Sequence, residues 1–280
     1  MKVGVLGGGR MGAGIAHTFL LAGDEVLVIE QDVESADAAA SRIRESLVRS
    51  VKRGTTTHAL EDLTDRLQTG TELTSFADRD LVIEAVPEDR ALKSEALARV
   101  ESVLAVDAVL ASNTSSISID ALAAPLARPQ SFLGLHFFNP VPSSSLVEIV
   151  SGSATDPALV VQARGWVEAL GKTPIVVRDS PGFASSRLGL VLALEAIRML
   201  DAGVASAEDI DRAMELGYRH PMGPLRTTDI VGLDVRLGIA EELCLTLGER
   251  FAPPSLLRQM VADGRLGRKS GEGFYRWDDE

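Results

Sequence analysis

Short runs of apolar, β-branched residues alternate along the first part of the chain with longer stretches in which apolar residues recur every three or four positions. The short runs predict strands, and the amphipathic stretches predict helices that cross from one strand to the next. The predicted strands cover residues 3–6, 25–29, 81–84, 108–111, 132–137, 146–150 and 174–177. The predicted helices cover residues 11–22, 33–53, 93–103 and 157–170. This alternation indicates an α/β fold built on a parallel sheet with crossover helices.

The pattern changes at the turn-rich sequence Asp179-Ser180-Pro181-Gly182, after which strand signals nearly vanish. Apolar residues then recur at helical spacing over residues 188–202, 207–216, 233–247 and 254–262. A chain of 280 residues that is 45% hydrophobic is long enough to bury two cores. We therefore predict an α/β domain over residues 1–182 and an all-helical domain over residues 183–280.

A glycine-rich sequence, GGGRMG at residues 7–12, lies between the first predicted strand and the first predicted helix. It fits the pattern G-x-G-x-x-G in the strand-to-helix context that raises this pattern above chance. Gly7 permits a tight turn, Gly9 lets a pyrophosphate approach the backbone, and Gly12 lets the helix pack closely on the strand. The first domain is therefore predicted to be a Rossmann-type dinucleotide-binding domain.

The cofactor itself is predicted from the residues around this turn. Arg10 and Met11 stand at the start of the predicted helix, where free N–H groups and a partial positive charge face the phosphates. Glu30 ends the second predicted strand about 20 residues later, where an acid accepts hydrogen bonds from the ribose hydroxyls and repels a 2′-phosphate. NAD is thus favoured over NADP, and FAD is disfavoured because a flavoprotein normally needs a larger chain. The alternative is a glycine-rich turn of an unrelated α/β fold, with Glu30 a solvated acid.

A histidine and a glutamate occupy matching positions in a predicted hairpin. Two apolar runs flank a polar turn, and His136 and Glu148 are equidistant from Pro142 at its centre. Antiparallel pairing about that centre would bring the two side chains together across the ladder. An imidazole oriented by a carboxylate suits removal of a hydroxyl proton while hydride leaves an alcohol carbon, and Asn139 would hold the reacting oxygen or a substrate carbonyl. The alternative is a core histidine satisfied by a neighbouring acid.

Composition disfavours several classes of partner. The net charge of −12 opposes binding to nucleic acid, although a few basic residues at one mouth can still attract a phosphorylated small molecule. Cys244 is the only cysteine, so no internal disulfide can form. Apolar stretches are interrupted before they reach the length that spans a bilayer, and the N-terminus enters a strand instead of a basic leader. We expect a cytoplasmic protein without a membrane partner.

Taken together, these residues resemble the short-chain L-3-hydroxyacyl-CoA dehydrogenase family, which includes the bacterial 3-hydroxybutyryl-CoA dehydrogenases. The resemblance covers essentially the whole chain and rests on the motifs GGGRMGAGIA (7–16), VIEAVPED (82–89), ASNTSS (111–116), HFFNPVP (136–142), LVEIV (146–150), SPGF (180–183), HPMGPL (220–225) and LGRKSGEGFY (266–275). It implies NAD-dependent oxidation of a 3-hydroxyacyl-CoA to the 3-oxoacyl-CoA. It also implies a homodimer formed through the helical domain.

The resemblance implies roles for single residues in catalysis and substrate binding. His136 would be the general base and Glu148 its orienting partner, with Ser115 and Asn139 as hydrogen-bonding groups for the substrate. The family usually has Asn at the position of Ser186, where it reaches the substrate, and the shorter side chain lacks the amide donor. The sequence Ser143-Ser144-Ser145 also replaces a bulkier, often Met- and Lys-containing stretch, so a differently shaped acyl pocket is expected.

Several charged residues are assigned to the cofactor and to CoA by the same resemblance. Glu88, Lys93 and Lys269 match cofactor contacts, although the residues alone would indicate solvated charges for the two lysines. Lys52 and Arg53 end the predicted helix over residues 33–53 in the region that contacts CoA in the family, and they would meet its phosphates. The alternative for these two is a solvated helix end that complements the helix dipole.

Two other functions remain open from the sequence. One is a dehydrogenase of a free hydroxy acid, such as the gulonate- or carnitine-oxidising relatives, in which the nicotinamide site persists and the CoA surface is repurposed. The other is a non-catalytic nucleotide-binding or structural protein of the same fold. Turnover on acyl-CoA compared with free acids distinguishes the first, and the joint presence of His136, Glu148, Ser115 and Asn139 argues against the second.

Overall fold

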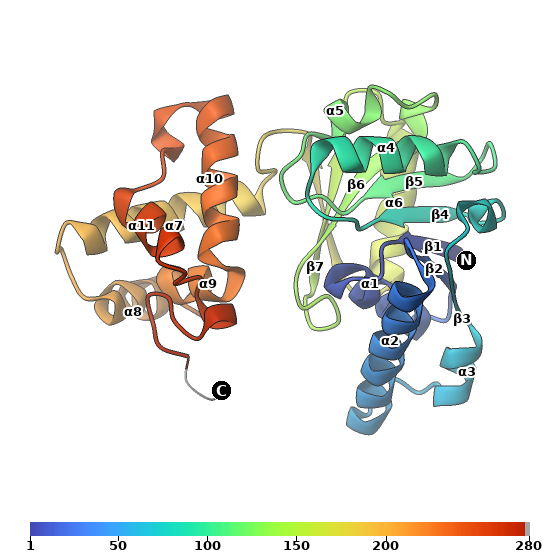
Figure 1. Cartoon of the computed structure of the whole chain (residues 1–280), viewed down its shortest axis with the longest axis horizontal. Coiled ribbons are helices and arrows are strands. Elements are labelled where there is room, and N and C mark those ends of the chain that lie inside the picture. The colour runs from blue at the N-terminus through green and yellow to red at the C-terminus, as the bar shows by residue number, and fades with distance from the viewer. Residues whose placement is uncertain (278–280) are drawn as a thin grey trace. The chain divides into compact units, whose positions relative to one another are not determined.

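The computed structural model of the chain describes residues 1–277 and divides it between Ser180 and Pro181 into two compact units. The first unit carries all eight strands of the sheet (Figure 1). Its elements are β1 (Lys2–Leu6), α1 (Arg10–Leu21), β2 (Glu25–Ile29), α2 (Val33–Arg53), α3 (Leu60–Asp65), β3 (Leu67–Gly70), η1 (Leu73–Phe76), β4 (Leu81–Glu84), α4 (Arg90–Glu101), β5 (Val109–Ser112), α5 (Ile119–Ala123), η2 (Pro129–Ser131), β6 (Phe132–Phe137), β7 (Leu146–Ser151), α6 (Pro157–Ala169) and β8 (Thr173–Arg178).

The sheet has the order β3-β2-β1-β4-β5-β6-β7-β8. Neighbouring strands are parallel throughout except for β6 and β7, which pair antiparallel. The strand order reverses beside β1, because β2 and β3 lie on one side of it and β4 to β8 on the other. In open α/β sheets of this kind, ligands bind outside the carboxyl ends of the strands at such a switch point.

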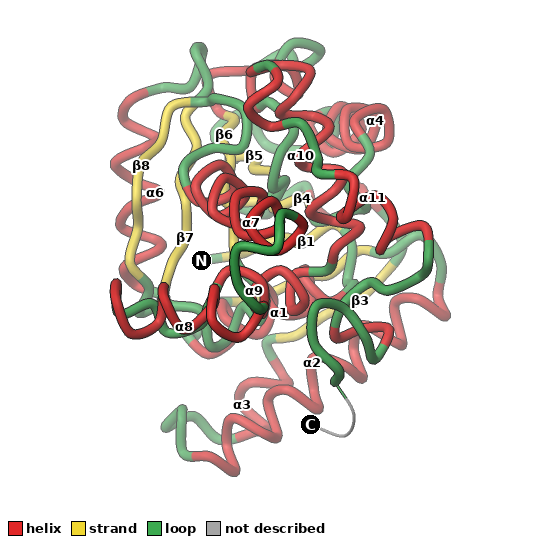
Figure 2. Tube along the Cα trace, turned by 90° about the vertical axis from the view of Figure 1, so that its left-hand side faces the viewer, coloured by secondary structure: helices red, strands yellow, loops and turns green. Residues whose placement is uncertain are grey.

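Apolar residues on both faces of the sheet explain why the central strands are buried. The helices α1, α2 and α6 pack on one face, where alternate strand residues such as Val3, Val5 and Ile83 join the main core with Ile15 and Phe19 of α1. The helices α4 and α5 pack against each other over the opposite face (Figures 1 and 2). This layering leaves the carboxyl ends of the strands, and the loops that follow them, as the edge where polar side chains gather.

The second unit is helical and has its own core. It comprises α7 (Ser185–Asp201), α8 (Ala207–Tyr218), α9 (Pro224–Val231), α10 (Leu233–Leu247), η3 (Glu249–Phe251), α11 (Ser255–Ala262) and η4 (Arg268–Ser270). Its core includes Leu190, Leu194, Leu233, Leu243 and Phe251. No helix among residues 1–277 is both long enough and apolar enough to cross a membrane.

The α/β fold with a helical second part is as predicted, and most predicted elements are present within a few residues. The short elements α3, β3, α5 and α9 were not predicted, because they carry too few apolar residues to show a period. Helix α4 begins at Arg90, three residues before the predicted start, because the Asp89 side chain accepts a hydrogen bond from the Leu92 N–H and caps it.

Candidate active site

The glycine-rich loop joins the carboxyl end of β1 to the N-terminus of α1. Gly7 has a φ of +92°, a left-handed conformation that favours glycine. A Cβ on Gly12 would lie 1.8 Å from the Gly7 carbonyl oxygen, so only glycine lets α1 pack this closely on the turn. A Cβ on Gly9 would meet nothing within 4 Å, and Gly9 offers no capping side chain. The first N–H groups of α1, which begins with Arg10, are therefore accessible to a pyrophosphate.

Glu30 follows β2 and lies against this loop. Its Oε1 accepts a hydrogen bond of 2.6 Å from the backbone N–H of Gly8. The Arg42 guanidinium, from α2, donates to the Gly8 carbonyl oxygen. Gly8 is thus held through both of its backbone groups, and the loop is tied to the acid predicted to bind the ribose. Arg42 was not predicted as part of this site, because nothing in the sequence of a long amphipathic helix distinguishes it from its neighbours.

A buried lysine connects the carboxyl ends of β4 and β5. Lys93 is 1% exposed, and its Nζ donates to Glu84 Oε1 at 2.6 Å and to the Val86 carbonyl oxygen at 3.1 Å. Glu84 is fully buried, and its Oε2 accepts from the Ser112 hydroxyl at 2.5 Å. Lys93 is therefore not the solvated helix charge that the residues alone would indicate, and its partner Glu84 was not predicted.

Glu88 joins this network from the loop after β4. Its Oε2 lies 3.3 Å from Lys93 Nζ, and its Oε1 accepts from the Thr114 hydroxyl at 2.6 Å and from the Ser115 N–H at 2.9 Å. Burial by itself would raise the pKa of Glu88, but the Lys93 ammonium and the hydrogen bonds from Thr114 and Ser115 outweigh it and lower the pKa below its ordinary value. The structure therefore brings together Glu88, Lys93 and Ser115, the residues to which the family resemblance assigns cofactor and substrate contacts, around the Glu88 carboxylate.

His136 and Glu148 face each other across the β6–β7 ladder, in the register predicted from their spacing. The distance from His136 Nδ1 to Glu148 Oε2 is 2.7 Å, and the two residues are 4% and 0% exposed. The carboxylate beside Nδ1 favours the tautomer with its proton on that nitrogen, which leaves Nε2 as the basic nitrogen. The Phe138 ring lies 4.4 Å from the imidazole, centroid to centroid. Such a pair can take up and release a proton.

The loop between these two strands is anchored by residues that the sequence did not single out. Lys172 Nζ, from the segment before β8, donates to the carbonyl oxygens of Val141 at 2.7 Å and Ser144 at 2.5 Å. A Cβ on Gly14 would lie 2.8 Å from Val141 Cβ, so α1 packs tightly against the same loop. Asn113 Oδ1 accepts from the Phe137 N–H at 2.9 Å and attaches the end of β6 to the segment after β5. Asn139 is exposed at the start of this loop.

The remaining predicted residues lie elsewhere. Lys52 and Arg53 are exposed at the C-terminal end of α2, where they fit either predicted role. Ser186, in the first turn of α7, and Lys269, in η4, belong to the second unit. Lys269 forms an ion pair of 2.6 Å with Asp234, at the start of α10. The parts of these four residues in binding stay predictions.

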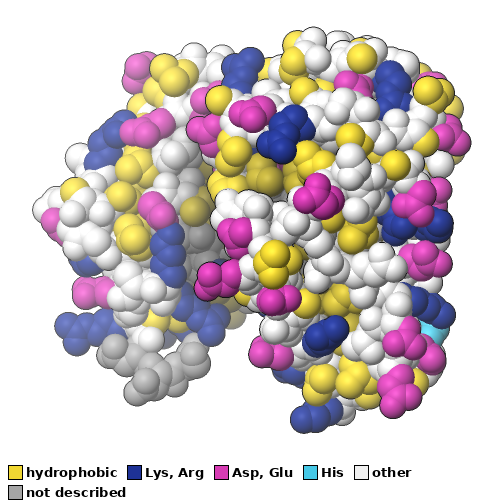
Figure 3. All heavy atoms as spheres, turned by 45° about the vertical axis from the view of Figure 1, so that its right-hand side comes forward, with side chains coloured by type: hydrophobic (Ala, Val, Ile, Leu, Met, Phe, Trp, Pro, Cys, Tyr) yellow, Lys and Arg dark blue, Asp and Glu magenta, His cyan; other side chains and the backbone are white. Residues whose placement is uncertain are grey.

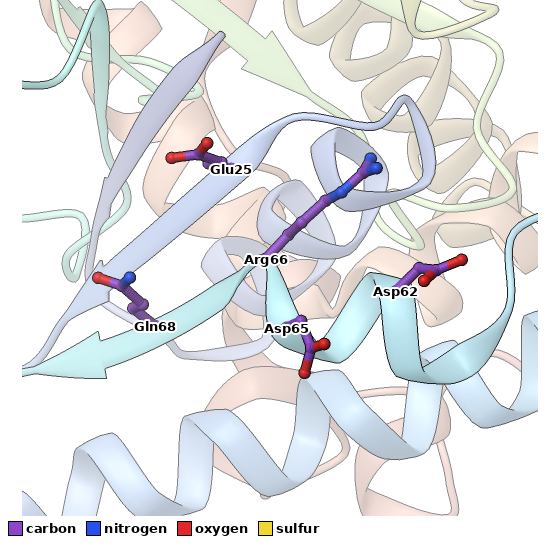
Figure 4. Close-up of a pocket in the computed structure, with 5 residues that line it drawn as sticks. All are labelled: Glu25, Asp62, Asp65, Arg66 and Gln68. Atoms are coloured by element: carbon purple, nitrogen blue, oxygen red, sulfur yellow. The ribbon is translucent and has the colours of Figure 1, made fainter.

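A shallow pocket elsewhere in the first unit has no connection with this chemistry. It is lined by Glu25, Asp62, Asp65, Arg66 and Gln68, and Figure 4 shows their side chains around the beginnings of β2 and β3. It therefore lies at the amino ends of the strands, whereas nucleotides bind at the carboxyl ends. On the face of the molecule that Figure 3 displays, basic and acidic side chains are interspersed and form no continuous basic surface.

Comparison with sequence families gives two matches that together span nearly the whole chain. Residues 2–180 match the family described as 3-hydroxyacyl-CoA dehydrogenase, NAD binding domain. Residues 182–277 match the family described as 3-hydroxyacyl-CoA dehydrogenase, C-terminal domain. The boundary between the matches falls at the division between the two structural units.

Individual proteins similar to this chain carry consistent names. The 3-hydroxybutyryl-CoA dehydrogenase of Mycobacterium tuberculosis is 46% identical over 280 residues, with 99% of this chain and 98% of the relative covered. The probable 3-hydroxybutyryl-CoA dehydrogenase of Deinococcus radiodurans is 44% identical over 278 residues, with 99% and 100% covered. Among solved structures, (S)-3-hydroxybutyryl-CoA dehydrogenase PaaH1 from Ralstonia eutropha has a TM-score of 0.94 at 37% identity, with 99% of each chain covered.

Proposed function

Since the chain belongs to the 3-hydroxyacyl-CoA dehydrogenase family, an NAD-dependent class of oxidoreductases, we propose that it oxidises an L-3-hydroxyacyl-CoA, such as 3-hydroxybutyryl-CoA. The product is the 3-oxoacyl-CoA, and the same site catalyses the reverse reaction. The observation that carries this proposal is the buried His136–Glu148 pair, in the same structural unit as the glycine-rich loop.

The residues around the loop fit a bound dinucleotide. The pyrophosphate would lie on the N-terminus of α1, against Gly7, Gly9, Arg10, Met11 and Gly12. Glu30, which follows β2, would bind the ribose hydroxyls. Glu88 and Lys93, which follow β4, would bind the nicotinamide end of the cofactor. Lys269 is the cofactor contact proposed from the second unit.

The His–Glu pair would supply the proton chemistry. A bound NAD would supply the acceptor for hydride from the alcohol carbon, so the hydroxyl proton must leave at the same stage. His136 Nε2 takes that proton as general base. Glu148 accepts the Nδ1–H, keeps the ring in position and stabilises the imidazolium as it forms, because the positive charge then balances the buried carboxylate.

Substrate positioning is assigned to polar groups near the pair. Ser115 and Asn139 would hydrogen-bond the hydroxyl and the thioester carbonyl, and Ser186 would contact the acyl group. Lys52 and Arg53 would meet the CoA phosphates through charge-assisted hydrogen bonds. These assignments rest on the family and on the chemistry of each side chain.

The assembly and the compartment are proposed on similar grounds. The second unit exposes large apolar residues, with Leu188, Val191 and Leu192 at 65%, 44% and 40% on α7 and Val235 at 44% on α10. A surface of this kind is a common feature of protein interfaces, so it supports a homodimer formed through this unit. We propose a cytoplasmic enzyme, since the single cysteine fits a reducing compartment.

The test compares 3-hydroxybutyryl-CoA with free 3-hydroxybutyrate in an assay that follows NADH formation. The proposed function requires turnover on the thioester and little on the free acid. Turnover on the free acid alone would support the hydroxy acid dehydrogenase instead. An intact NAD affinity without turnover on either substrate would indicate a non-catalytic protein.

A further inference from the structure

An arginine of α2 lies beside the acid that follows β2. Arg42 donates a hydrogen bond to the carbonyl oxygen of Gly8, and Glu30 Oε1 accepts one from the N–H of the same glycine. Only the atoms of Gly8 separate the guanidinium from the carboxylate, so the two charges lie within about 9 Å of each other. No ion pair joins them directly within residues 1–277, so the glycine-rich loop holds each side chain independently of the other.

The packing of α2 explains why a side chain of this helix reaches the loop. A Cβ on Gly8 would lie 2.3 Å from the Cβ of Ala39, so only glycine lets the loop and the helix approach this closely. Arg42 follows Ala39 by three residues, and residues three apart on a helix are neighbours on one face. The place of Arg42 at the loop is therefore set by the packing of a helix.

Most of the hydrogen-bond donors of Arg42 are open to a ligand. A guanidinium has five N–H donors, and the bond to Gly8 uses one of them. Arg42 is exposed, and no other hydrogen bond or ion pair of the described part of the chain involves it. The remaining donors can meet an anion without breaking another contact of the folded protein. A planar guanidinium is well suited to phosphate, whose oxygens accept two parallel N–H bonds.

The proposed place of the ribose connects these donors with the cofactor. Glu30 is the acid proposed to bind the ribose hydroxyls, and the Gly8 N–H holds its carboxylate at the loop. NADP carries a phosphate in place of one of these hydroxyls. That phosphate would meet the Glu30 carboxylate, which repels it, and the Arg42 guanidinium, which attracts it. In dinucleotide-binding domains that accept NADP, a nearby arginine accommodates the 2′-phosphate.

We propose that Arg42 is a specificity residue that binds the 2′-phosphate of NADP, so that the preference for NAD depends on Glu30 alone. This inference rests on the ribose position in the proposed function and deepens it. In the wild-type protein the carboxylate at the ribose outweighs the guanidinium. Once the charge of Glu30 is removed, an unopposed cation remains at the same place, and the loop already holds it.

The test measures dissociation constants for NAD and NADP by fluorescence titration in wild type, Glu30→Gln, Arg42→Met and the double variant. In Glu30→Gln the ratio of the NADP to the NAD constant should fall about tenfold or more, and adding Arg42→Met should raise it again about tenfold. A loosened loop affects both cofactors alike and cancels in this ratio. Arg44→Met is the matched control, since Arg44 is exposed on another face of α2, and it should leave the ratio unchanged.

Two shorter nucleotides localise the effect to the adenosine end. Adenosine 2′,5′-bisphosphate and 5′-AMP differ only by the 2′-phosphate, and each is titrated in competition with NAD. In Glu30→Gln the bisphosphate should bind about tenfold more tightly, and added salt should reduce this difference because the proposed pair is partly exposed. Arg42→Met should abolish the difference. Arg42→Lys should keep part of it, since lysine keeps the charge and loses the planar fork.

The results that would overturn the inference are distinct. If Arg42→Met leaves the ratio of the two constants unchanged in the Glu30→Gln protein, the guanidinium acts only on the loop or on a group that both cofactors share. An equal effect of Arg44→Met would indicate the general charge of α2. An unchanged ratio in Glu30→Gln itself would remove the ribose from this place. Every measurement is one of binding, so failure of the proposed reaction with NAD affinity intact is recognised separately.

Discussion

The carboxylate of Glu30 accepts a hydrogen bond from the backbone N–H of Gly8, with 2.6 Å between Oε1 and the nitrogen. The acid at the end of β2 therefore has a structural function in the loop as well as its proposed function at the ribose. A substitution of Glu30 changes both unless it keeps an oxygen in the same place.

Glu30→Gln separates these two functions. The amide oxygen can still accept from Gly8, whereas the charge that repels a 2′-phosphate is gone, so the ratio of NADP to NAD dissociation constants should fall about tenfold or more. Glu30→Ala should weaken both cofactors, because the loop also loses its anchor. Fluorescence titration with NAD and NADP measures the two constants. An unchanged ratio in Glu30→Gln would remove this residue from the ribose site.

The proposed base is tested by His136→Gln. Glutamine can hydrogen-bond to a hydroxyl but cannot hold its proton, so kcat should fall at least about 100-fold while NAD affinity is kept. Glu148→Gln should be impaired as well, because the imidazolium loses its counter-charge. If the pair acts as a unit, the double variant loses far less than the product of the two single losses. Wild-type turnover and an unchanged pH profile in His136→Gln would reject the mechanism.

The buried Lys93–Glu84 pair predicts a large effect on stability. Lys93→Met leaves the fully buried Glu84 carboxylate without its cation, which should lower the free energy of unfolding by about 3–5 kcal/mol. Adding Glu84→Gln should restore much of this loss. Lys2→Met is the control, since the Lys2–Asp78 pair is exposed and should contribute no more than about 1 kcal/mol. Urea denaturation measures all four proteins, and similar losses in the two lysine variants would contradict the prediction.

The basic end of α2 predicts an effect on CoA thioesters alone. Lys52→Ala with Arg53→Ala should raise KM for 3-hydroxybutyryl-CoA several-fold, and less so as salt is added, because exposed charges are screened. The affinity for NAD should stay nearly constant. A control with two exposed arginines of the second unit removed, Arg212→Ala with Arg258→Ala, matches the change in net charge. A KM that responds equally to both double substitutions would indicate a general effect of charge and no local site.

His17 predicts a loss of stability in mild acid. Its imidazole is buried in α1 with Nε2 2.9 Å from the Ser50 hydroxyl, and burial, helped by the cations of Arg49 and Lys172, lowers its pKa to about 4. Below about pH 6.5 the unfolded chain takes up a proton that the folded protein refuses until about pH 4. The free energy of unfolding should therefore fall over this window by up to about 3 kcal/mol. Urea denaturation of wild type and His17→Gln between pH 7 and pH 4.5 tests this, and equal slopes would contradict it.

The predictability of each part of the site depended on how far apart its residues are in the chain. The His136–Glu148 contact was predicted because both residues flank one short turn, and their register follows from the local spacing. The position of Glu30 followed from the pattern G-x-G-x-x-G, which is accompanied by an acid about 20 residues later at the end of the next strand.

Buried charges were beyond this kind of reasoning. Lys93 stands at helical spacing from the buried Leu97 and Val100 of α4. Arg236 stands in the same way on the buried face of α10, between Leu233 and Ala240. Spacing alone indicates the face but not the groups that enclose a charge on it. Glu84 ends a strand like many exposed acids, and its burial depends on Lys93 arriving from a different element. Short elements such as β3 were not predicted because their own residues give almost no signal. The four residues of β3 belong to the sheet through hydrogen bonds to β2.

Lys172 binds the loop after β6 entirely through backbone carbonyl oxygens, those of Val141 and Ser144. Every amino acid offers the same carbonyl group, so this attachment makes no demand on the side chains at residues 143–145. Mutations there can alter the chemistry of the loop without releasing it, while His136 and Glu148 keep their places in the strands on either side. If the loop lines the proposed acyl pocket, substitutions at residues 143–145 can change that pocket while the His136–Glu148 contact is kept.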